Sequence, residues 1–124
     1  MSTSSPTVRS PLDRFRLDDQ VTVVTGASSG LGAHFASVLH GAGAQVVLTA
    51  RRADRLESLA AGLPGAHVIV ADMADDADRE RLVAGALARF GRVDVLVNNA
   101  GVGGSVAVED ETLERFRTSM EVNV

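Results

Sequence analysis

Four residue types are missing from the 124-residue chain: cysteine, tryptophan, tyrosine and lysine. Without cysteine there is no disulfide bond, thiolate metal site or cysteine nucleophile. Without tyrosine or lysine the chain cannot complete, by itself, a mechanism that needs a phenol or an amine. A phosphate-binding loop that ends in Gly-Lys-Ser/Thr is excluded as well, because its lysine is absent. The 12 cationic side chains are therefore all arginines.

Negative charge and a shortage of long apolar runs narrow the possible partners. The net charge of −4 gives no overall attraction to nucleic acid or to an anionic membrane surface. No apolar run approaches the roughly 18 residues of a membrane-spanning helix, and the N-terminus lacks the apolar core of a secretory signal. The three histidines do not have the spacing of metal ligands. We therefore expect a cytoplasmic protein with no metal site, no nucleic-acid partner and no membrane partner.

Short β-branched runs alternate with amphipathic segments along most of the chain. The predicted strands are 21–25, 45–49, 67–71 and 93–97. The predicted helices are 31–40, 53–61, Asp75 to Phe90, and one that begins near Asp110 and is incomplete at Val124. This alternation predicts an α/β fold, a doubly wound parallel sheet with strand order 3-2-1-4 and helices on both faces. Residues 1–14, rich in Ser, Thr and Pro, are predicted to be a disordered tail before a single domain part at 15–124.

The sequence TGASSGLG at 25–32 runs from the end of the first strand into the first helix. Gly26 permits the tight turn that leaves the strand, Gly30 keeps the backbone open to a pyrophosphate, and Gly32 lets the helix pack closely. The helix N-terminus offers free amides and a partial positive charge to phosphate groups. Because the glycines follow a strand and open a helix, they predict a dinucleotide-binding loop. Its predicted cofactor-binding residues are Gly26, Ser28, Ser29, Gly30, Leu31 and Gly32.

The end of the second strand indicates which dinucleotide is preferred. Folds that prefer NAD place an Asp or Glu about 20 residues beyond the loop, where it binds the ribose 2′-hydroxyl. Here Ala50 lies 18 positions after Gly32, and Arg51 and Arg52 follow it. Guanidinium groups suit a 2′-phosphate, so we expect NADP(H) in preference to NAD(H). The alternative is that both are solvated surface arginines without a ligand.

Polar residues also follow the third and fourth strands, at the edge of the sheet where ligands bind in such folds. Asp72, with Met73 beside it, follows the third strand. Its carboxylate is placed to accept a hydrogen bond from an adenine amino group, or equally to cap a helix or a turn. Asn-Asn-Ala-Gly at 98–101 follows the fourth strand. An asparagine there can bond the backbone of a neighbouring turn, although this motif alone also fits an ordinary loop.

Taken together, these motifs resemble the short-chain dehydrogenase/reductase family. TGASSGLG at 25–32, Asp72, NNAG at 98–101 and the terminal MEVNV occur in the family's order, and the resemblance covers about 15–124. It implies a Rossmann-like fold and hydride transfer between a nicotinamide cofactor and a small carbonyl or alcohol substrate. Ala-Arg-Arg at 50–52 resembles the NADP(H)-preferring branch.

The resemblance also implies roles for single residues. Asn99, Ala100 and Gly101 would line the cofactor pocket and support the central strand. Asn123 matches a helix asparagine of the family's catalytic set, which holds a water between the catalytic lysine and solvent. A polar residue without function near the chain end is the alternative for Asn123.

The family's Ser and Tyr-x-x-x-Lys come later than Val124, and so does its fifth strand. We therefore expect the chain to be the N-terminal cofactor-binding part of a larger, homo-oligomeric oxidoreductase and to be inactive alone. We also expect the fourth strand to present an unpaired apolar edge that favours aggregation. The alternative is a non-catalytic NADP(H)-binding module completed by a partner chain. An extended epimerase-type relative is a third possibility, from which NNAG points away.

Overall fold

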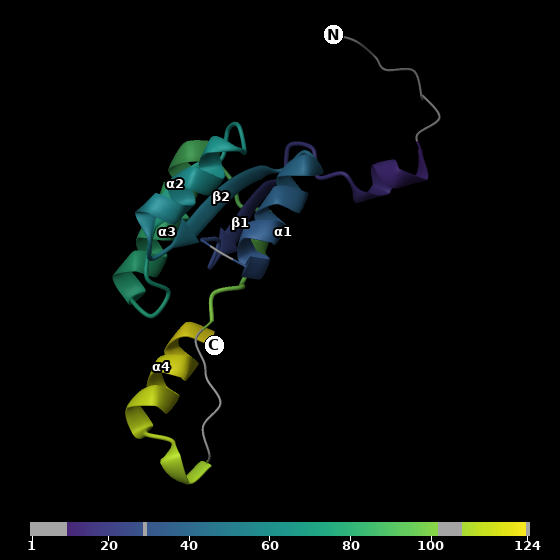
Figure 1. Cartoon of the computed structure of the whole chain (residues 1–124). Helices are drawn as coiled ribbons and strands as arrows, with labels where there is room; N and C mark the ends of the chain where they lie inside the picture. The colour runs from purple at the N-terminus through teal and green to yellow at the C-terminus, as the bar shows by residue number, and fades with distance from the viewer. Residues whose placement is uncertain (1–9, 29, 102–107, 124) are drawn as a thin grey trace.

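A four-stranded parallel sheet with helices packed on it forms the body of the molecule (Figure 1). The computed structural model describes residues 10–28, 30–101 and 108–123. The strands are β1 (Val21–Thr25), β2 (Gln45–Ala50), β3 (His67–Val70) and β4 (Val95–Val97). The α-helices are α1 (Gly30–Gly41), α2 (Ala53–Ala61), α3 (Asp76–Phe90) and α4 (Leu113–Asn123). Two 3-10 helices, η1 (Pro11–Phe15) and η2 (Val108–Asp110), complete the described elements.

The strand order confirms the predicted doubly wound topology. The order is β3-β2-β1-β4, and every neighbouring pair is parallel. β1 lies inside the sheet with Val23 opposite Val47 of β2 and Leu96 of β4. Because all four strands point the same way, their carboxyl ends meet along one edge, where the loops that follow them come together.

Two apolar clusters, one on each face of the sheet, hold the helices in place. On one face, Val24 and Leu48 pack with Ala36 of α1 and Leu56 of α2. On the other face, Val21, Val23, Val47 and Ile69 pack with Leu82 and Ala86 of α3. Alternate residues of β1 and β2 thus serve opposite faces, as strand geometry requires. This explains why every residue of β1 and the residues 46–49 of β2 are buried, and it confirms that helices cover both faces.

Element boundaries differ from the expected ones where a side chain replaces a backbone partner. β4 begins at Val95 and not at Val93, because Asp94 Oδ2 accepts the Val21 amide at 2.8 Å and takes the place of a backbone acceptor. α4 begins at Leu113, later than expected, and Thr112 Oγ1 accepts the Arg115 amide at 3.1 Å. α3 starts as predicted after Asp75, whose Oδ1 accepts the Asp78 amide at 3.0 Å.

The predicted tail and loop extend beyond the described residues. Residues 1–9 lie outside them, and η1 at Pro11–Phe15 contains no buried residue. The disorder of residues 1–14 therefore stays a prediction. Residues 102–107 of the glycine-rich loop also lie outside the described part of the chain.

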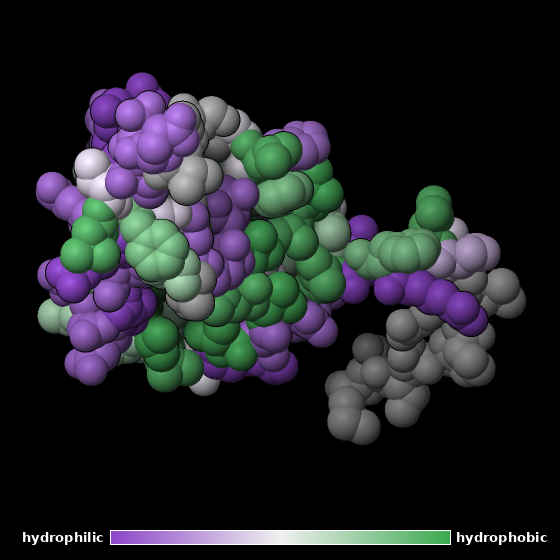
Figure 2. Space-filling model, turned by 90° about the horizontal axis from the view of Figure 1, so that it is seen from below, coloured by the Kyte–Doolittle hydropathy of each residue, from purple (hydrophilic) through white to green (hydrophobic). Residues whose placement is uncertain are grey.

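Large apolar side chains are exposed on several elements. Figure 2 shows a broad hydrophobic area on the face seen from below, the side on which α4 lies in Figure 1. Leu96 of β4 is 61% exposed, and β4 has a strand neighbour on one side only within the described residues. That an apolar edge is exposed agrees with expectation, while its tendency to aggregate stays a prediction. No helix within the described ranges is long and apolar enough to cross a membrane.

Candidate functional site

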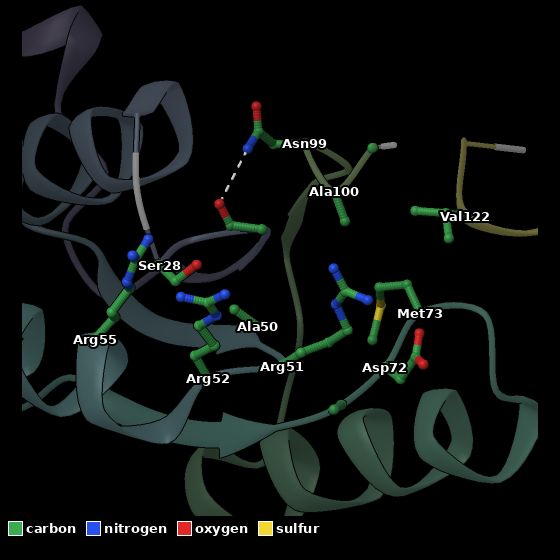
Figure 3. Close-up of a pocket in the computed structure, with 13 residues that line it drawn as sticks. Ser28, Ala50, Arg51, Arg52, Arg55, Asp72, Met73, Asn99, Ala100 and Val122 are labelled. Atoms are coloured by element: carbon green, nitrogen blue, oxygen red, sulfur yellow. Dashed lines mark hydrogen bonds between the residues drawn. The ribbon is translucent and has the colours of Figure 1, made fainter. Parts of the chain in front are cut away.

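A pocket of about 650 Å³ opens at the carboxyl ends of the strands (Figure 3). It collects residues from all four strand-to-helix connections and from α4. Nine predicted cofactor-binding residues line it together: Gly26, Ser28, Arg51, Arg52, Asp72, Met73, Asn99, Ala100 and Gly101. Gly30, Leu31 and Gly32 belong to the first turn of α1 and are not among its lining residues. Ser29 lies outside the described residues.

Two glycines of the first loop are required by close packing. Gly26 has a φ of +62°, and a Cβ added there would lie 2.9 Å from Ala100 Cα. A Cβ added at Gly32 would lie 2.1 Å from the Gly26 carbonyl oxygen and 2.6 Å from Asn99 Nδ2. All three distances are shorter than real Cβ contacts. The absence of these side chains is what lets α1 and the β4 loop close against the turn after β1.

At position 30, glycine is favoured by the backbone conformation and not by close packing. Its φ is +59°, which L side chains rarely adopt, yet a Cβ added there would meet no atom within 4 Å. Gly30 is the first residue of α1, and the space beside its backbone is open. This agrees with the expectation that Gly30 keeps the loop accessible, while contact with a pyrophosphate stays a prediction.

Thr25 ties the first loop to the fourth strand, a role that was not expected from the sequence. Its Oγ1 accepts the amides of Asn99 at 3.0 Å and Ala100 at 2.9 Å, and donates to the Val97 carbonyl at 3.4 Å. The residue is only 2% exposed. A threonine ending a buried strand is a weak signal, because its partners lie more than 70 residues away and only the folded sheet brings them close.

Asn99 bridges the same two loops with its side chain. Its Nδ2 donates to the Gly26 carbonyl at 3.3 Å. This confirms the expectation that an asparagine after the fourth strand bonds the backbone of a neighbouring turn. Together, Thr25 and Asn99 hold one wall of the pocket in a defined position against β1.

Three arginines line the opposite side of the pocket: Arg51, Arg52 and Arg55. Among the described residues none of their guanidinium groups has an ion pair or hydrogen-bonding partner, whereas Arg16, Arg79, Arg81, Arg92 and Arg115 each pair with a nearby carboxylate. Three unpaired guanidinium groups around one cavity repel each other and attract an anion. Arg55 is an addition to the expected set. Its sequence signal is its place three residues after Arg52, on the same end of α2.

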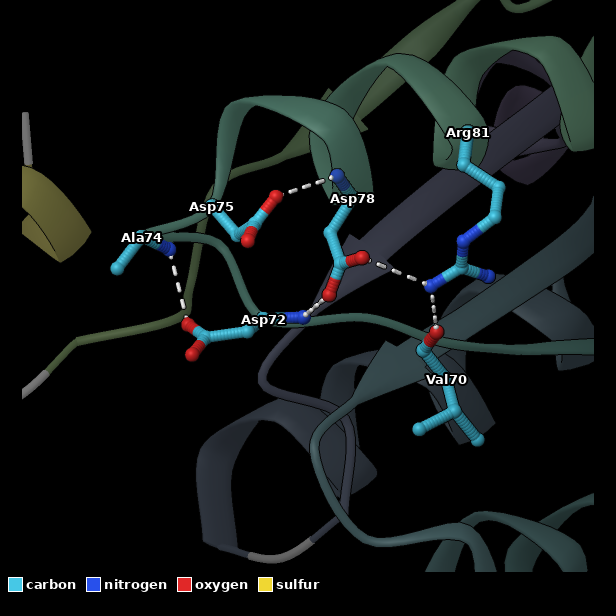
Figure 4. Close-up of polar contacts among 6 residues, drawn as sticks. All are labelled: Val70, Asp72, Ala74, Asp75, Asp78 and Arg81. Atoms are coloured by element: carbon cyan, nitrogen blue, oxygen red, sulfur yellow. Dashed lines mark hydrogen bonds and ion pairs between the residues drawn. The ribbon is translucent and has the colours of Figure 1, made fainter.

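Asp72 forms part of a hydrogen-bonded turn and also lines the pocket (Figure 4). Its Oδ1 accepts the Ala74 amide at 2.9 Å, so the turn role that was one of the two alternatives is present. Its own amide donates to Asp78 Oδ2 at 2.8 Å. Arg81 donates to the Val70 carbonyl at 2.5 Å and pairs with Asp78 at 3.3 Å. The adenine-binding role of Asp72 stays a prediction.

Two carboxylates that hold backbone amides have lowered pKa values. The Asp72 amide and then Arg81 hold the pKa of Asp78 below its ordinary value. Arg92 and then the Val21 amide do the same for the pKa of Asp94. A carboxylate with a lowered folded-state pKa contributes stability above its unfolded pKa, near 4, and this is lost as the pH falls through the folded value.

We predict that the free energy of unfolding is nearly level between about pH 7 and pH 5 and falls below about pH 4. Asp94→Asn should make the fall shallower, because its carboxamide oxygen can still accept the Val21 amide but does not titrate. Urea unfolding of both proteins at about pH 7, 5 and 3.5 measures this. An equally steep acid fall in wild type and variant would contradict the assignment to Asp94.

The end of α4 contacts the loop that follows β4. Val122 lines the pocket, and a Cβ added at Gly101 would lie 3.0 Å from Asn123 Oδ1. Asn123 Nδ2 donates to Ser119 Oγ at 3.1 Å on the same helix. The structure therefore brings Asn123 to the edge of the predicted cofactor pocket. Its role in catalysis stays a prediction.

Known relatives show which family the chain belongs to. The sequence model described as short chain dehydrogenase matches residues 20–124. The chain belongs to the short-chain dehydrogenase family. A family member from Mus musculus, dehydrogenase/reductase SDR family member 7B, is 40% identical over 115 residues, covering 86% of this chain and 36% of the relative. D-threitol dehydrogenase of Mycolicibacterium smegmatis is 39% identical over 114 residues, covering 89% of this chain and 44% of the relative.

Solved structures of short-chain dehydrogenases match the same part of the fold. A short-chain dehydrogenase from Burkholderia cenocepacia in complex with NADP gives a TM-score of 0.83 at 36% identity, over 88% of this chain and 46% of that one. The 3-ketoacyl-(acyl-carrier-protein) reductase of Brucella melitensis, complexed with NADH, gives a TM-score of 0.82 at 37% identity. The match covers 86% of this chain and 45% of that one. The chain thus spans less than half the length of these relatives. Among its described residues no group of three or more His, Asp or Glu is placed to hold a metal ion.

Proposed function

We propose that this chain is the cofactor-binding portion of an NADP(H)-dependent short-chain oxidoreductase, acting on a small carbonyl or alcohol substrate. The observation that carries the proposal is the cluster of unpaired arginines, Arg51 and Arg52 at the end of β2 with Arg55, in a pocket beside a glycine loop. An NAD-preferring site needs a carboxylate at the end of β2, and Ala50 stands there.

The pocket residues fit the parts of NADP(H). The turn at Gly26 and Ser28, with the open backbone at Gly30, suits the pyrophosphate. Asp72 and Met73 suit the adenine ring, and the arginines suit the 2′-phosphate. Asn99, Ala100 and Gly101 form the wall nearest α4 and suit the nicotinamide half.

In this proposal the residues of this chain bind and orient the cofactor, and they do not transfer the proton of the carbonyl or alcohol group. When bound, the cofactor supplies or accepts a hydride at its nicotinamide ring. Thr25 and Asn99 fix the loop against which that half would lie. Such positioning supplies a large part of an enzyme's rate enhancement. Proton transfer in this family needs a phenol and an amine, which the chain does not contain.

Arg51→Ala tests the cofactor preference. Loss of a charged hydrogen bond costs about 1.5–3 kcal/mol, so we predict roughly 10- to 100-fold weaker NADPH binding and less than about threefold weaker NADH binding. Calorimetric titration of both cofactors measures the two constants. Arg14→Ala, which removes the same charge from exposed η1, is the control and should leave both unchanged. Equal losses for NADPH and NADH in Arg51→Ala would refute the preference.

A further inference from the structure

We propose that Asp78 of α3 is a positioning residue for adenine recognition, because it fixes the turn that carries Asp72. The inference rests on the proposed function, in which Asp72 borders the adenine ring, and it gives a role to a residue that is not among those lining the pocket. Two observations support it. Side chains of α3 hold the backbone around Asp72, and one carboxylate oxygen of Asp72 has no partner among the described residues.

The carboxylate of Asp72 uses one of its two oxygens in the turn. Oδ1 accepts the Ala74 amide at 2.9 Å, which fixes the rotation of the side chain. Within the described part of the chain Oδ2 accepts no hydrogen bond, and the residue lines the pocket. The turn role and the adenine role are therefore compatible, one for each oxygen. Whether Oδ2 reaches a ligand then depends on how firmly the turn is held.

Asp78 holds the backbone of Asp72 directly (Figure 4). Its Oδ2 accepts the Asp72 amide at 2.8 Å, and its own amide donates to Asp75 Oδ1, the N-cap of α3, at 3.0 Å. The Asp72 amide and then Arg81 hold the pKa of Asp78 below its ordinary value. The acceptor is therefore charged at neutral pH, and a charged acceptor makes the stronger hydrogen bond.

Two arginines of α3 extend this hold to both sides of the turn. Arg81 Nη2 donates to the Val70 carbonyl at 2.5 Å and pairs with Asp78 Oδ1 at 3.3 Å. Arg79 Nη1 donates to the Met73 carbonyl. The backbone from the end of β3 to Met73 is thus attached to α3 at several successive positions, and Asp78 is the member that contacts the residue between them.

The helix that carries these side chains is itself fixed on the sheet. Leu82 and Ala86 are buried in the cluster that includes Ile69 of β3. Leu82 lies four residues after Asp78 and so on the same side of α3. The burial of Leu82 therefore keeps Asp78 facing the end of β3, where the Asp72 turn lies.

The test compares NADPH with its hypoxanthine analogue, in which an oxo group replaces the amino group of the adenine ring. An oxo group cannot donate to Asp72, so the unmodified chain should bind NADPH about tenfold more tightly than the analogue. Asp78→Ala should reduce this preference to less than about threefold, because the Asp72 turn is no longer held. Asp78→Asn should retain most of it, since its carboxamide oxygen can still accept the Asp72 amide. Calorimetric titration of the full 124-residue chain measures the constants.

Two further variants control for charge and for folding. Asp54→Ala removes a carboxylate from the first turn of α2, and among the described residues that side chain has no hydrogen-bonding partner. It should leave the preference unchanged. Arg81 has a side chain that is 54% exposed, so Arg81→Gln should stay folded. Because it removes the guanidinium group that holds Asp78 and Val70, it should lower the preference about twofold.

The outcomes separate the inference from the function on which it rests. A wild-type chain that binds neither ligand would overturn the proposed function. Equal binding of NADPH and the analogue would overturn the adenine role of Asp72 and this inference with it, but not the preference for NADPH over NADH. A preference that stays about tenfold in Asp78→Ala or in Arg81→Gln would overturn the inference alone, even where both ligands bind more weakly, because a general loss of stability does not distinguish them.

Discussion

Thr25→Val is expected to lower the free energy of unfolding by about 1–3 kcal/mol, with a loss of NADPH affinity of at least about tenfold. Valine keeps the shape of threonine but cannot accept the amides of Asn99 and Ala100. The Ala100 amide would be left without an acceptor, at a cost of about 1–3 kcal/mol, whereas the Asn99 amide would keep the Val97 carbonyl at 3.0 Å. The loop that carries Asn99, Ala100 and Gly101 would then lose its attachment to β1. Urea unfolding and NADPH titration measure the two effects.

Thr22→Val is the matched control, on the same strand. Thr22 is as buried as Thr25, but its Oγ1 has no hydrogen-bonding partner among the described residues. Replacing an unsatisfied buried hydroxyl by a methyl group is expected to be neutral or stabilising by about 1 kcal/mol. If both valine variants were equally unstable, the loss would come from packing on β1 and not from the Thr25 hydrogen bonds.

Gly32→Ala is expected to destabilise the chain by about 1–3 kcal/mol and to abolish measurable dinucleotide binding. The added Cβ would lie 2.1 Å from the Gly26 carbonyl oxygen, so α1 or the turn after β1 must move. That turn also receives the Asn99 side chain, and both loops would shift together. Thermal unfolding and NADPH titration of the purified variant test this.

Gly41→Ala, in the last turn of the same helix, is the control for the helix itself. A Cβ added at Gly41 meets no atom within 4 Å. Alanine is favoured over glycine in helices by up to about 1 kcal/mol, so this variant should be neutral or slightly more stable. Equal behaviour of the two alanine variants would contradict the packing role assigned to Gly32.

Much of the fold could be predicted because the strand patterns and the helix-end signals along the sequence indicate the same topology. The runs at β1 and β2 are rich in β-branched residues on both faces, which requires cover on both faces and so indicates a parallel sheet. Asp75 and Gly91 mark the ends of α3, as N-cap and left-handed C-cap. The boundary of β4 could not be predicted, because it depends on Asp94 accepting an amide from Val21, a contact across 73 residues.

The candidate site was predictable where a backbone requirement selects glycine and less so where a side chain acts at long range. Gly26 and Gly32 were expected, and their packing has the predicted consequence. Thr25 was missed because its hydroxyl meets partners from β4 only after the sheet forms. Arg55 was missed because helical periodicity predicts only that α2 is amphipathic. That its polar face borders a pocket becomes evident only once α2 is placed beside the loop of Ser28.

The exposed apolar surface extends beyond the β4 edge that the sequence predicts. A second open pocket of about 610 Å³ lies between α3, β4 and α4, and includes Leu82, Leu96 and Met120. The relatives of this family are more than twice as long as the part matched here.

The ratio of the dissociation constants of NADPH and NADH for the unmodified 124-residue chain tests the proposed cofactor preference most directly. We predict that NADPH binds at least about tenfold more tightly, because only its 2′-phosphate can engage the unpaired arginines. Raising the salt concentration should reduce this ratio, since the contact is between exposed charges. Equal affinities for NADPH and NADH, or tighter binding of NADH, would contradict it.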